Sequence, residues 1–174
     1  GDKKSRIITR ADGVYIYDAE GNKILDGMSG LWCVNIGYGR KEIVKAAERQ
    51  LSELPYYNSF FQCANPPSIE LSEKLGELTQ PQFNRVFYTG SGSESIDTML
   101  KMVWRYWDLM GQPERKTIIA RENAYHGSTV AGASLGGMTP MHKQGGIMPY
   151  IEHIQQPYWF GSDRKLSNEE FGLQ

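Results

Sequence analysis

A glycine-rich hexad at residues 90–95, Gly-Ser-Gly-Ser-Glu-Ser, follows an extended apolar segment and precedes a long amphipathic one. This order constrains the fold more than any other feature of the chain. Residues 85–89 are rich in β-branched and aromatic side chains, as strands are. Apolar side chains recur at helical spacing over residues 93–110, and a second short apolar run occupies residues 117–120. Strand, helix and strand predict a βαβ unit with a right-handed crossover, and hence an α/β fold with a mostly parallel sheet.

The hexad is placed to bind an anion. It lies at the start of the predicted helix, where unpaired backbone N–H groups gather and the helix dipole favours negative charge. Gly90 and Gly92 let a ligand approach the backbone closely. Ser91 and Ser93 add hydroxyl groups. A plain helix cap is the alternative, since Ser91-x-x-Glu94 also matches a capping box, but two glycines exceed what a cap requires. We therefore interpret the hexad as a phosphate site that can also cap the helix.

The loop after the second predicted strand supplies an aromatic ring. Neighbouring parallel strands end at the same edge of a sheet, where ligands of α/β proteins bind. Residues 123–127, Asn-Ala-Tyr-His-Gly, follow that strand directly, so Tyr125 is expected near the hexad. A flat, phosphorylated ligand would be held by its phosphate and stacked on this ring. Without the hexad, Tyr125 and His126 would be interpreted as ordinary loop residues.

Other phosphate motifs fit the hexad less well. The sequence contains no Gly-x-x-x-x-Gly-Lys-Ser/Thr motif, so a P-loop nucleotide site is not predicted. The dinucleotide motif Gly-x-Gly-x-x-Gly is nearly met, but Ser95 replaces its last glycine. Glu122 is a candidate for the acidic partner of a ribose, although it lies about 32 residues further on instead of about 20. A dinucleotide-binding oxidoreductase therefore stays an alternative.

Three motifs in this order resemble those of class III aminotransferases. They are Ser-Gly-Ser-Glu at residues 91–94, Tyr-His-Gly at residues 125–127, and Leu-Trp-Cys-Val-Asn-Ile-Gly-Tyr-Gly at residues 31–39. The resemblance covers almost the whole chain and is closest to the omega-amino acid and amine:pyruvate transaminases. It implies fold type I, the aspartate aminotransferase fold, with pyridoxal 5'-phosphate (PLP) as cofactor. It also implies transamination between an amine or omega-amino acid and a keto acid such as pyruvate. The sequence departs from the family at Ser95-Ile96, where Ala-Asn is common.

The resemblance implies roles for the residues of the hexad and of the tyrosine loop. Ser91, Gly92 and Ser93 would hold the cofactor phosphate. Tyr125 would stack on the pyridine ring, and His126 would support the loop.

The resemblance also implies a substrate pocket at a dimer interface, formed by two aromatic segments. Residues 26–39 are glycine-rich and aromatic, and residues 56–61 hold four aromatic side chains in six positions, which a solvated loop would not carry without a partner. The implied pocket residues are Leu31, Trp32, Phe60 and Phe61. For the first two, plain hydrophobic packing is an equally good explanation.

The remaining segments complete the predicted organisation. Residues 7–26 predict a β-hairpin. Periodicity, Pro and cap signals predict helices at residues 41–54, 66–78 and 128–135 and the start of another helix at residue 167. Between them, an irregular loop is predicted at residues 136–149 and a strand at residues 150–155. Two domains are predicted: residues 1–50 as an N-terminal arm with a small-domain segment, and residues 51–174 as the first half of the large PLP-binding domain.

No catalytic residue is predicted in this chain, because none of its lysines lies in the family's Schiff-base lysine motif. The chain is therefore expected to be a truncated, amino-terminal part that is inactive alone. A parallel sheet that stops midway leaves an open edge, so self-association is expected, as a homodimer or higher oligomer. A non-catalytic self-associating module stays a second alternative.

The composition of the chain indicates which classes of binding partner are not expected. A net charge of −1 with 22% charged residues implies no nucleic acid partner, and the apolar runs are too short to cross a membrane. Cys33 and Cys63 lack metal or redox spacing, which predicts reduced thiols in a cytoplasmic protein and no metal site. The expected partners are a small-molecule amine, a keto acid and further copies of the chain.

Overall fold

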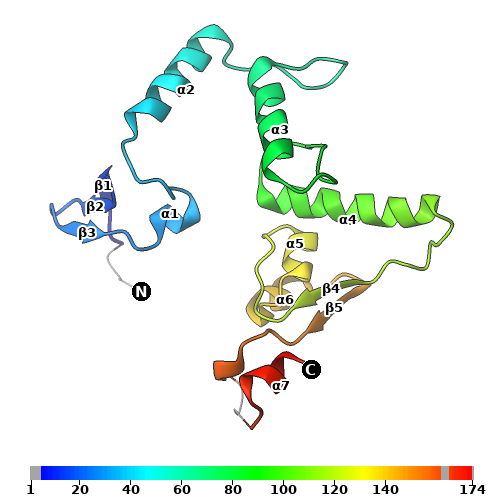
Figure 1. Ribbon diagram of the computed structural model, residues 1–174. Helices are drawn as coiled ribbons and strands as arrows, with labels where there is room; N and C mark the ends of the chain where they lie inside the picture. Colours follow the sequence, from blue (N-terminus) through cyan, green and yellow to red (C-terminus); the bar gives the residue numbers. More distant parts are fainter. Residues whose placement is uncertain (1–4, 162–164, 174) are drawn as a thin grey trace. The chain divides into compact units, whose positions relative to one another are not determined.

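The computed structural model describes residues 5–161 and 165–173 (Figure 1). The chain divides into two compact units between Asn84 and Arg85. Each unit is described by itself. The first unit holds an antiparallel sheet and three helices, and the second holds a parallel strand pair with four helices and a short 3₁₀ helix among the described residues. The predicted limit between residues 50 and 51 stays a prediction.

The first unit begins with three antiparallel strands, β1 (Ile8–Asp12), β2 (Tyr15–Asp18) and β3 (Lys23–Leu25), in the order β1-β2-β3. This confirms the hairpin. Asp18 is buried, and its carboxylate accepts hydrogen bonds from the backbone N–H and the side-chain amide of Asn22, at 2.8 and 2.9 Å. These hydrogen bonds hold the turn between β2 and β3, and the Asn22 side chain lowers the pKa of Asp18.

Three helices follow, α1 (Ser29–Trp32), α2 (Lys41–Glu53) and α3 (Pro66–Leu78). The two long ones match the predicted ranges. The side chain of Asn65 caps α3 by accepting the Ser68 N–H at 3.1 Å, and Pro66 stands at the first helical position, which does not need an N–H.

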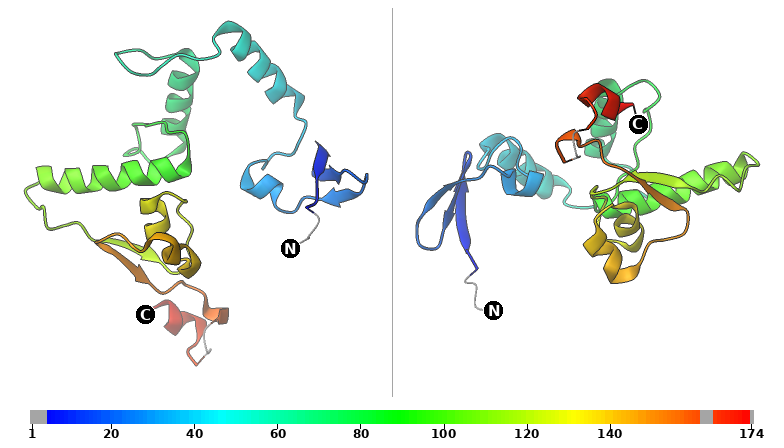
Figure 2. Two further views of the ribbon diagram at one scale, coloured as in Figure 1. Left: turned by 180° about the vertical axis from the view of Figure 1, so that it is seen from behind. Right: turned by 90° about the horizontal axis from the view of Figure 1, so that it is seen from below.

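The second unit is formed by α4 (Gly92–Leu109), β4 (Ile118–Arg121), α5 (Val130–Leu135), α6 (Thr139–Gly145), β5 (Ile151–Ile154), the 3₁₀ helix η1 (Trp159–Gly161) and α7 (Asn168–Gly172). Strands β4 and β5 pair in parallel, and α5 and α6 form the connection between them. Helix α5 packs against α4 and against α6 (Figures 1 and 2). The small core of this unit contains Ala120, Leu135 and Ile151, with Ile96 and Met148 packed against it.

Two predicted elements of the second unit are wrong. Residues 85–89 form no strand, since β4 pairs with β5 and no described strand pairs with this segment. The predicted βαβ unit through α4 is therefore absent among the described residues, and the parallel pair joins β4 to β5 instead. Residues 139–145 form α6 where an irregular loop was predicted. Pro140 fits the first turn of a helix, and Gly146, with φ of 78°, ends it.

Candidate functional site

The first turn of α4 carries the hexad. Ser91 is the N-cap residue, and its hydroxyl oxygen accepts the N–H of Glu94 at 3.2 Å. Glu94 does not return a hydrogen bond to the Ser91 backbone among the described contacts, so only half of the predicted capping box forms. Its carboxylate lies beside Gly90 instead, where an added Cβ would stand 2.8 Å from Oε2. The cap therefore uses one backbone N–H group, that of Glu94, and leaves the N–H groups of the two preceding residues without this partner.

Two backbone amides of this turn are open. No acceptor within the described part of the chain contacts the N–H of Gly92 or of Ser93. Apart from Gly92 itself, its two chain neighbours and the backbone of its own helix, no heavy atom lies within 4 Å of a Cβ built on Gly92. Free N–H groups at the start of an 18-residue helix, with space beside them, form a seat for an anion. The residues present therefore fit a phosphate group.

The loop after β4 is joined to this turn by close packing. Gly127 is buried with φ of 121°, and a Cβ at this position would overlap the hydroxyl of Ser93 and lie 2.9 Å from its Cα. The Ser128 N–H donates to the same hydroxyl oxygen at 3.1 Å. The structure thus brings the hexad and the tyrosine loop together through packing and a hydrogen bond, although residues 85–89 form no strand beside β4.

A second contact holds the same loop. The Thr129 hydroxyl donates to Oδ1 of Asp97 at 2.7 Å and accepts the Gly132 N–H at 3.1 Å, which caps α5. Neither Thr129 nor Asp97 was a predicted site residue. The N-cap signal of a threonine before a run of small residues is visible in the sequence, but its partner on α4 is not.

The side chains of Tyr125 and His126 differ in exposure. Tyr125 is 65% exposed and so is accessible to a flat ligand, whereas His126 is half-buried. Gly132 of α5 packs beneath the loop, since a Cβ there would stand 2.9 Å from the His126 carbonyl oxygen.

The four predicted substrate residues belong to the first unit and are exposed. Leu31 is 67% exposed and Trp32 is 81% exposed, and Phe60 and Phe61 are at 72% and 92%. The two phenylalanine rings lie 6.5 Å apart between centroids. Packing within this unit therefore does not account for these side chains, and they are free to meet a ligand or another surface.

The segment around Leu31 is organised by one carboxylate. Oδ2 of Asp26 accepts the Gly30 N–H and the Tyr38 hydroxyl, each at 2.7 Å, and Oδ1 accepts the Met28 N–H at 3.1 Å. The hydrogen bond from Tyr38 lowers the pKa of Asp26, and the same bond raises the pKa of Tyr38. Leu31 itself has φ of 62°, in the left-handed region that non-glycine residues rarely adopt.

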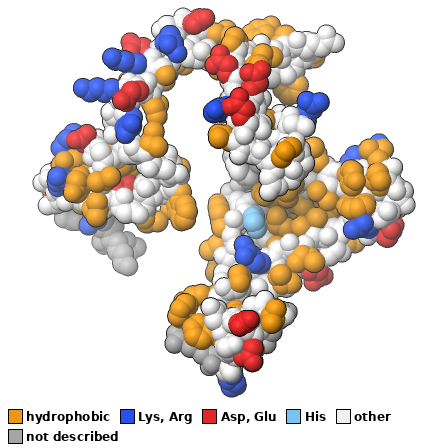
Figure 3. All heavy atoms as spheres, viewed as in Figure 1, with side chains coloured by type: hydrophobic (Ala, Val, Ile, Leu, Met, Phe, Trp, Pro, Cys, Tyr) orange, Lys and Arg blue, Asp and Glu red, His pale blue; other side chains and the backbone are white. Residues whose placement is uncertain are grey.

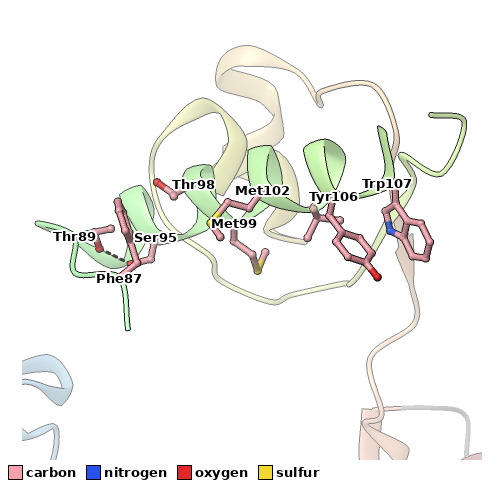
Figure 4. Close-up of a pocket in the computed structure, with 9 residues that line it drawn as sticks. Phe87, Thr89, Ser95, Thr98, Met99, Met102, Tyr106 and Trp107 are labelled. Atoms are coloured by element: carbon pink, nitrogen blue, oxygen red, sulfur yellow. Dashed lines mark hydrogen bonds between the residues drawn. The ribbon is translucent and has the colours of Figure 1, made fainter. Parts of the chain in front are cut away.

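An apolar groove along α4 was not foreseen (Figure 4). It has a volume of about 480 Å³, and Thr89, Ser95 and Thr98 are its polar residues. The apolar residues that line it are Phe87, Met99, Met102, Val103, Tyr106 and Trp107. Thr89 and Ser95 hydrogen-bond through their hydroxyls at 2.5 Å, which connects the segment before the hexad to α4. The groove is one of several places where hydrophobic side chains reach the surface (Figure 3).

Other kinds of site find no support in the described residues. They contain no group of three or more His, Cys, Asp or Glu side chains arranged to hold a metal ion. Within the same residues, no helix is both long and apolar enough to cross a membrane. Cys33 and Cys63 are free thiols.

Comparison with known proteins gives consistent matches. The family described as aminotransferase class-III matches residues 1–170. The chain is 58% identical over 173 residues to a putrescine–pyruvate aminotransferase of Pseudomonas aeruginosa, covering 99% of this chain and 38% of that protein. It is 43% identical to a vanillin aminotransferase of Capsicum annuum, again over 99% of this chain and 38% of the relative. The chain thus spans about 38% of the length of these curated relatives.

The solved structures that resemble this chain include omega-transaminases. An (S)-enantioselective omega-transaminase from Thermomicrobium roseum superposes with a TM-score of 0.91 at 38% identity, over 97% of this chain and 38% of that one. An omega-transaminase from Pseudomonas jessenii in complex with PMP gives a TM-score of 0.90 at 38% identity, over 96% of this chain and 37% of that one.

Proposed function

The chain belongs to the class-III aminotransferase family, and from this premise we propose that the complete gene product transfers an amino group from an amine or omega-amino acid to a keto acid such as pyruvate. By family it is an enzyme of fold type I whose cofactor is PLP. The relative named for putrescine and pyruvate supports an aliphatic amine as donor and pyruvate as acceptor. The family match favours this function over a dinucleotide-binding oxidoreductase.

One observation carries the proposal for the site: the open amides of Gly92 and Ser93 stand next to the loop that presents Tyr125, joined by the Ser128 to Ser93 hydrogen bond. Ser91, Gly92 and Ser93 bind the cofactor phosphate through backbone N–H groups and hydroxyls. The ring of Tyr125 fixes the plane of the pyridine, and His126 supports the loop. When bound, PLP acts as an electron sink for the carbon that carries the amino group.

The substrate pocket is proposed from exposure. Leu31, Trp32, Phe60 and Phe61 present bare apolar surface in the first unit, as expected for side chains that are covered by a substrate or a second subunit. They would exclude water from the reacting amine and favour an apolar donor. This proposal includes a homodimer, in which these aromatic segments meet the partner. A cytoplasmic location is proposed from the two free thiols.

The 174-residue chain by itself is proposed to be inactive, because none of its lysines lies in the family's lysine motif. A non-catalytic self-associating module stays the alternative for the isolated chain. Sedimentation tests self-association: a monomeric, monodisperse species would contradict it.

The site is tested at Gly92 in the complete gene product. Gly92→Asp places a carboxylate in the phosphate seat, while an acidic residue in the first helical turn is well tolerated by the helix itself. Gly92→Asn is the matched control, equal in size but neutral. The affinity for PLP, measured by titration, should fall by about tenfold or more in the Asp variant, with a smaller fall for Asn. Equal affinity in all three proteins would overturn the assignment.

A further inference from the structure

Two histidines outside the proposed cofactor contacts converge on one backbone carbonyl. Nε2 of His142, on α6, lies 2.5 Å from the carbonyl oxygen of Gly136. Nε2 of His153, on β5, lies 3.0 Å from the same oxygen and 3.2 Å from that of Leu135. The two rings are 5.1 Å apart between centroids. Because a carbonyl oxygen only accepts, both Nε2 atoms carry the hydrogen.

This carbonyl ends α5. Gly136 is the C-cap residue, and its oxygen and that of Leu135 are among the helix-end acceptors that the helix itself cannot satisfy. Histidine side chains satisfy such carbonyls favourably. The distances show that both histidines act on the same atom.

We call the contact of His142 and His153 with the Gly136 carbonyl oxygen the histidine clamp. The next residue, Gly137, is hydrogen-bonded to the tyrosine loop. The Gly137 N–H donates to the Ala124 carbonyl oxygen at 2.9 Å, and the Asn123 N–H donates to the Gly137 carbonyl oxygen at 3.0 Å. A Cβ on Gly137 would overlap the Arg121 carbonyl oxygen, so the two backbones are in close contact. Tyr125 is the next residue after this reciprocal pair. Any displacement of Gly137 therefore reaches the backbone that sets the ring of Tyr125.

We propose that His142 and His153 are positioning residues, which hold the Gly136–Gly137 backbone so that Tyr125 is oriented for the cofactor ring. The inference rests on the proposed function, since it gives Tyr125 a ligand. It predicts a specific defect: loss of the clamp weakens binding of a ligand that has a ring and leaves binding of phosphate alone unchanged. A purely structural cap of α5 would alter both or neither.

The test uses the complete gene product, freed of cofactor, with two probes. Pyridoxamine 5'-phosphate reports ring and phosphate contacts together, and inorganic phosphate reports the hexad alone. His153→Ala should raise the dissociation constant for pyridoxamine 5'-phosphate roughly two- to tenfold, the range expected for one hydrogen bond. The dissociation constant for inorganic phosphate should not change. His153→Gln, which keeps an N–H donor, should restore most of the affinity. Lys143→Ala, an exposed neighbour of the clamp on α6, is the matched control and should bind as wild type does.

A double-mutant cycle separates positioning from folding. If His153 acts through Tyr125, the combination of His153→Ala with Tyr125→Ala should weaken pyridoxamine 5'-phosphate binding no further than Tyr125→Ala alone. Additive effects would overturn the inference, and so would equal losses for both probes.

Should His153→Ala not fold, the same cycle is run with His142→Ala, which removes the other donor. If Tyr125→Ala leaves affinity unchanged, the proposed function fails at this residue, and the inference fails with it. If Tyr125→Ala weakens binding and neither histidine variant does, only the inference fails.

Discussion

The two units of the chain present their proposed site residues in opposite ways. In the second unit, backbone packing and side-chain hydrogen bonds connect the first turns of α4 to the end of the tyrosine loop, through Gly127, Ser128 and Thr129. In the first unit, the proposed substrate residues are bare, and Asp26 accepts three hydrogen bonds from the segment that carries Leu31 and Trp32. A phosphate seat needs fixed amides, whereas an apolar pocket needs only surfaces that a ligand or a partner can cover. The cofactor side, meaning the hexad and the tyrosine loop, is therefore held together by contacts within the second unit. The substrate side, meaning the exposed residues Leu31, Trp32, Phe60 and Phe61, is left to be covered by a ligand or a second subunit.

The largest effect is expected at Gly127, where the two parts of the cofactor side are in direct contact. Gly127→Ala forces a side chain into the left-handed region and into the Ser93 hydroxyl. We expect a loss of about 2–4 kcal/mol in the stability of this region. Hydrogen exchange of the β4 amides measures it.

Gly145 provides the matched control for that substitution. It lies on α6 with no heavy atom within 4 Å of an added Cβ and without a positive φ. Gly145→Ala should leave the exchange of β4 unchanged. Similar exchange rates in the two alanine variants would show that the close approach at Gly127 does not hold the loop.

The next effect concerns Thr129, which caps α5 and bonds Asp97 at once. Thr129→Val keeps the shape and removes the hydroxyl, so a loss of about 1–2 kcal/mol is expected. Thr129→Ser keeps the hydroxyl and should recover most of it. Thermal unfolding of the complete gene product distinguishes the two variants. A serine variant as unstable as the valine variant would mean that packing of the Thr129 methyl group holds this junction.

The same contrast explains what could be predicted from sequence. Helices α2, α3 and α4 were predictable because spacing, caps and end signals such as Asn65, Pro55 and Gly111 are local. The hexad and the tyrosine loop were predicted to be neighbours from two strands that end at one sheet edge. Residues 85–89 form no strand, however, and the two segments meet through Gly127 and Ser128 against Ser93 instead.

The failures involve partners that are distant in sequence. Residues 85–89 have the composition of a strand, but a strand also needs a partner, and composition does not report one. Residues 136–149 were predicted as an irregular loop, although Pro140 fits the first turn of α6. The meeting of His142 and His153 at Gly136 depends on how α6 and β5 return to α5, which no local pattern reports.

A pH titration tests the support that the Asp26 carboxylate gives to the segment around Leu31. Because the pKa of Asp26 is lowered by the Tyr38 hydroxyl, its stabilising effect is complete above the ordinary value of 3.8 and disappears as the pH falls through the lowered value. The pKa of Tyr38 is raised, so its contribution is complete below 10.0 and disappears as the pH rises through the raised value. The Gly30 amide resonance, followed by NMR, should therefore move only at these two extremes. Asp26→Asn should abolish the acid transition, and an acid midpoint at or above 3.8 in the wild type would contradict the hydrogen-bond account.

The smallest effect on stability, and the sharpest test of the contrast, is expected at Leu31. Leu78, on α3, is 72% exposed against 67% for Leu31, so the two leucines form a matched pair in one unit. Substitution of either by alanine should change the free energy of unfolding by no more than about 0.5 kcal/mol, because neither side chain is packed. If Leu31 contacts the amine, however, Leu31→Ala in the complete gene product should raise the KM for the donor by about tenfold, the scale expected for lost apolar contact in a pocket. Leu78→Ala should leave that KM unchanged. Equal KM values in the two variants would remove Leu31 from the pocket, and a large stability loss for Leu31→Ala alone would mean that this segment is packed after all. Either result would end the distinction drawn between an assembled cofactor side and an uncovered substrate side.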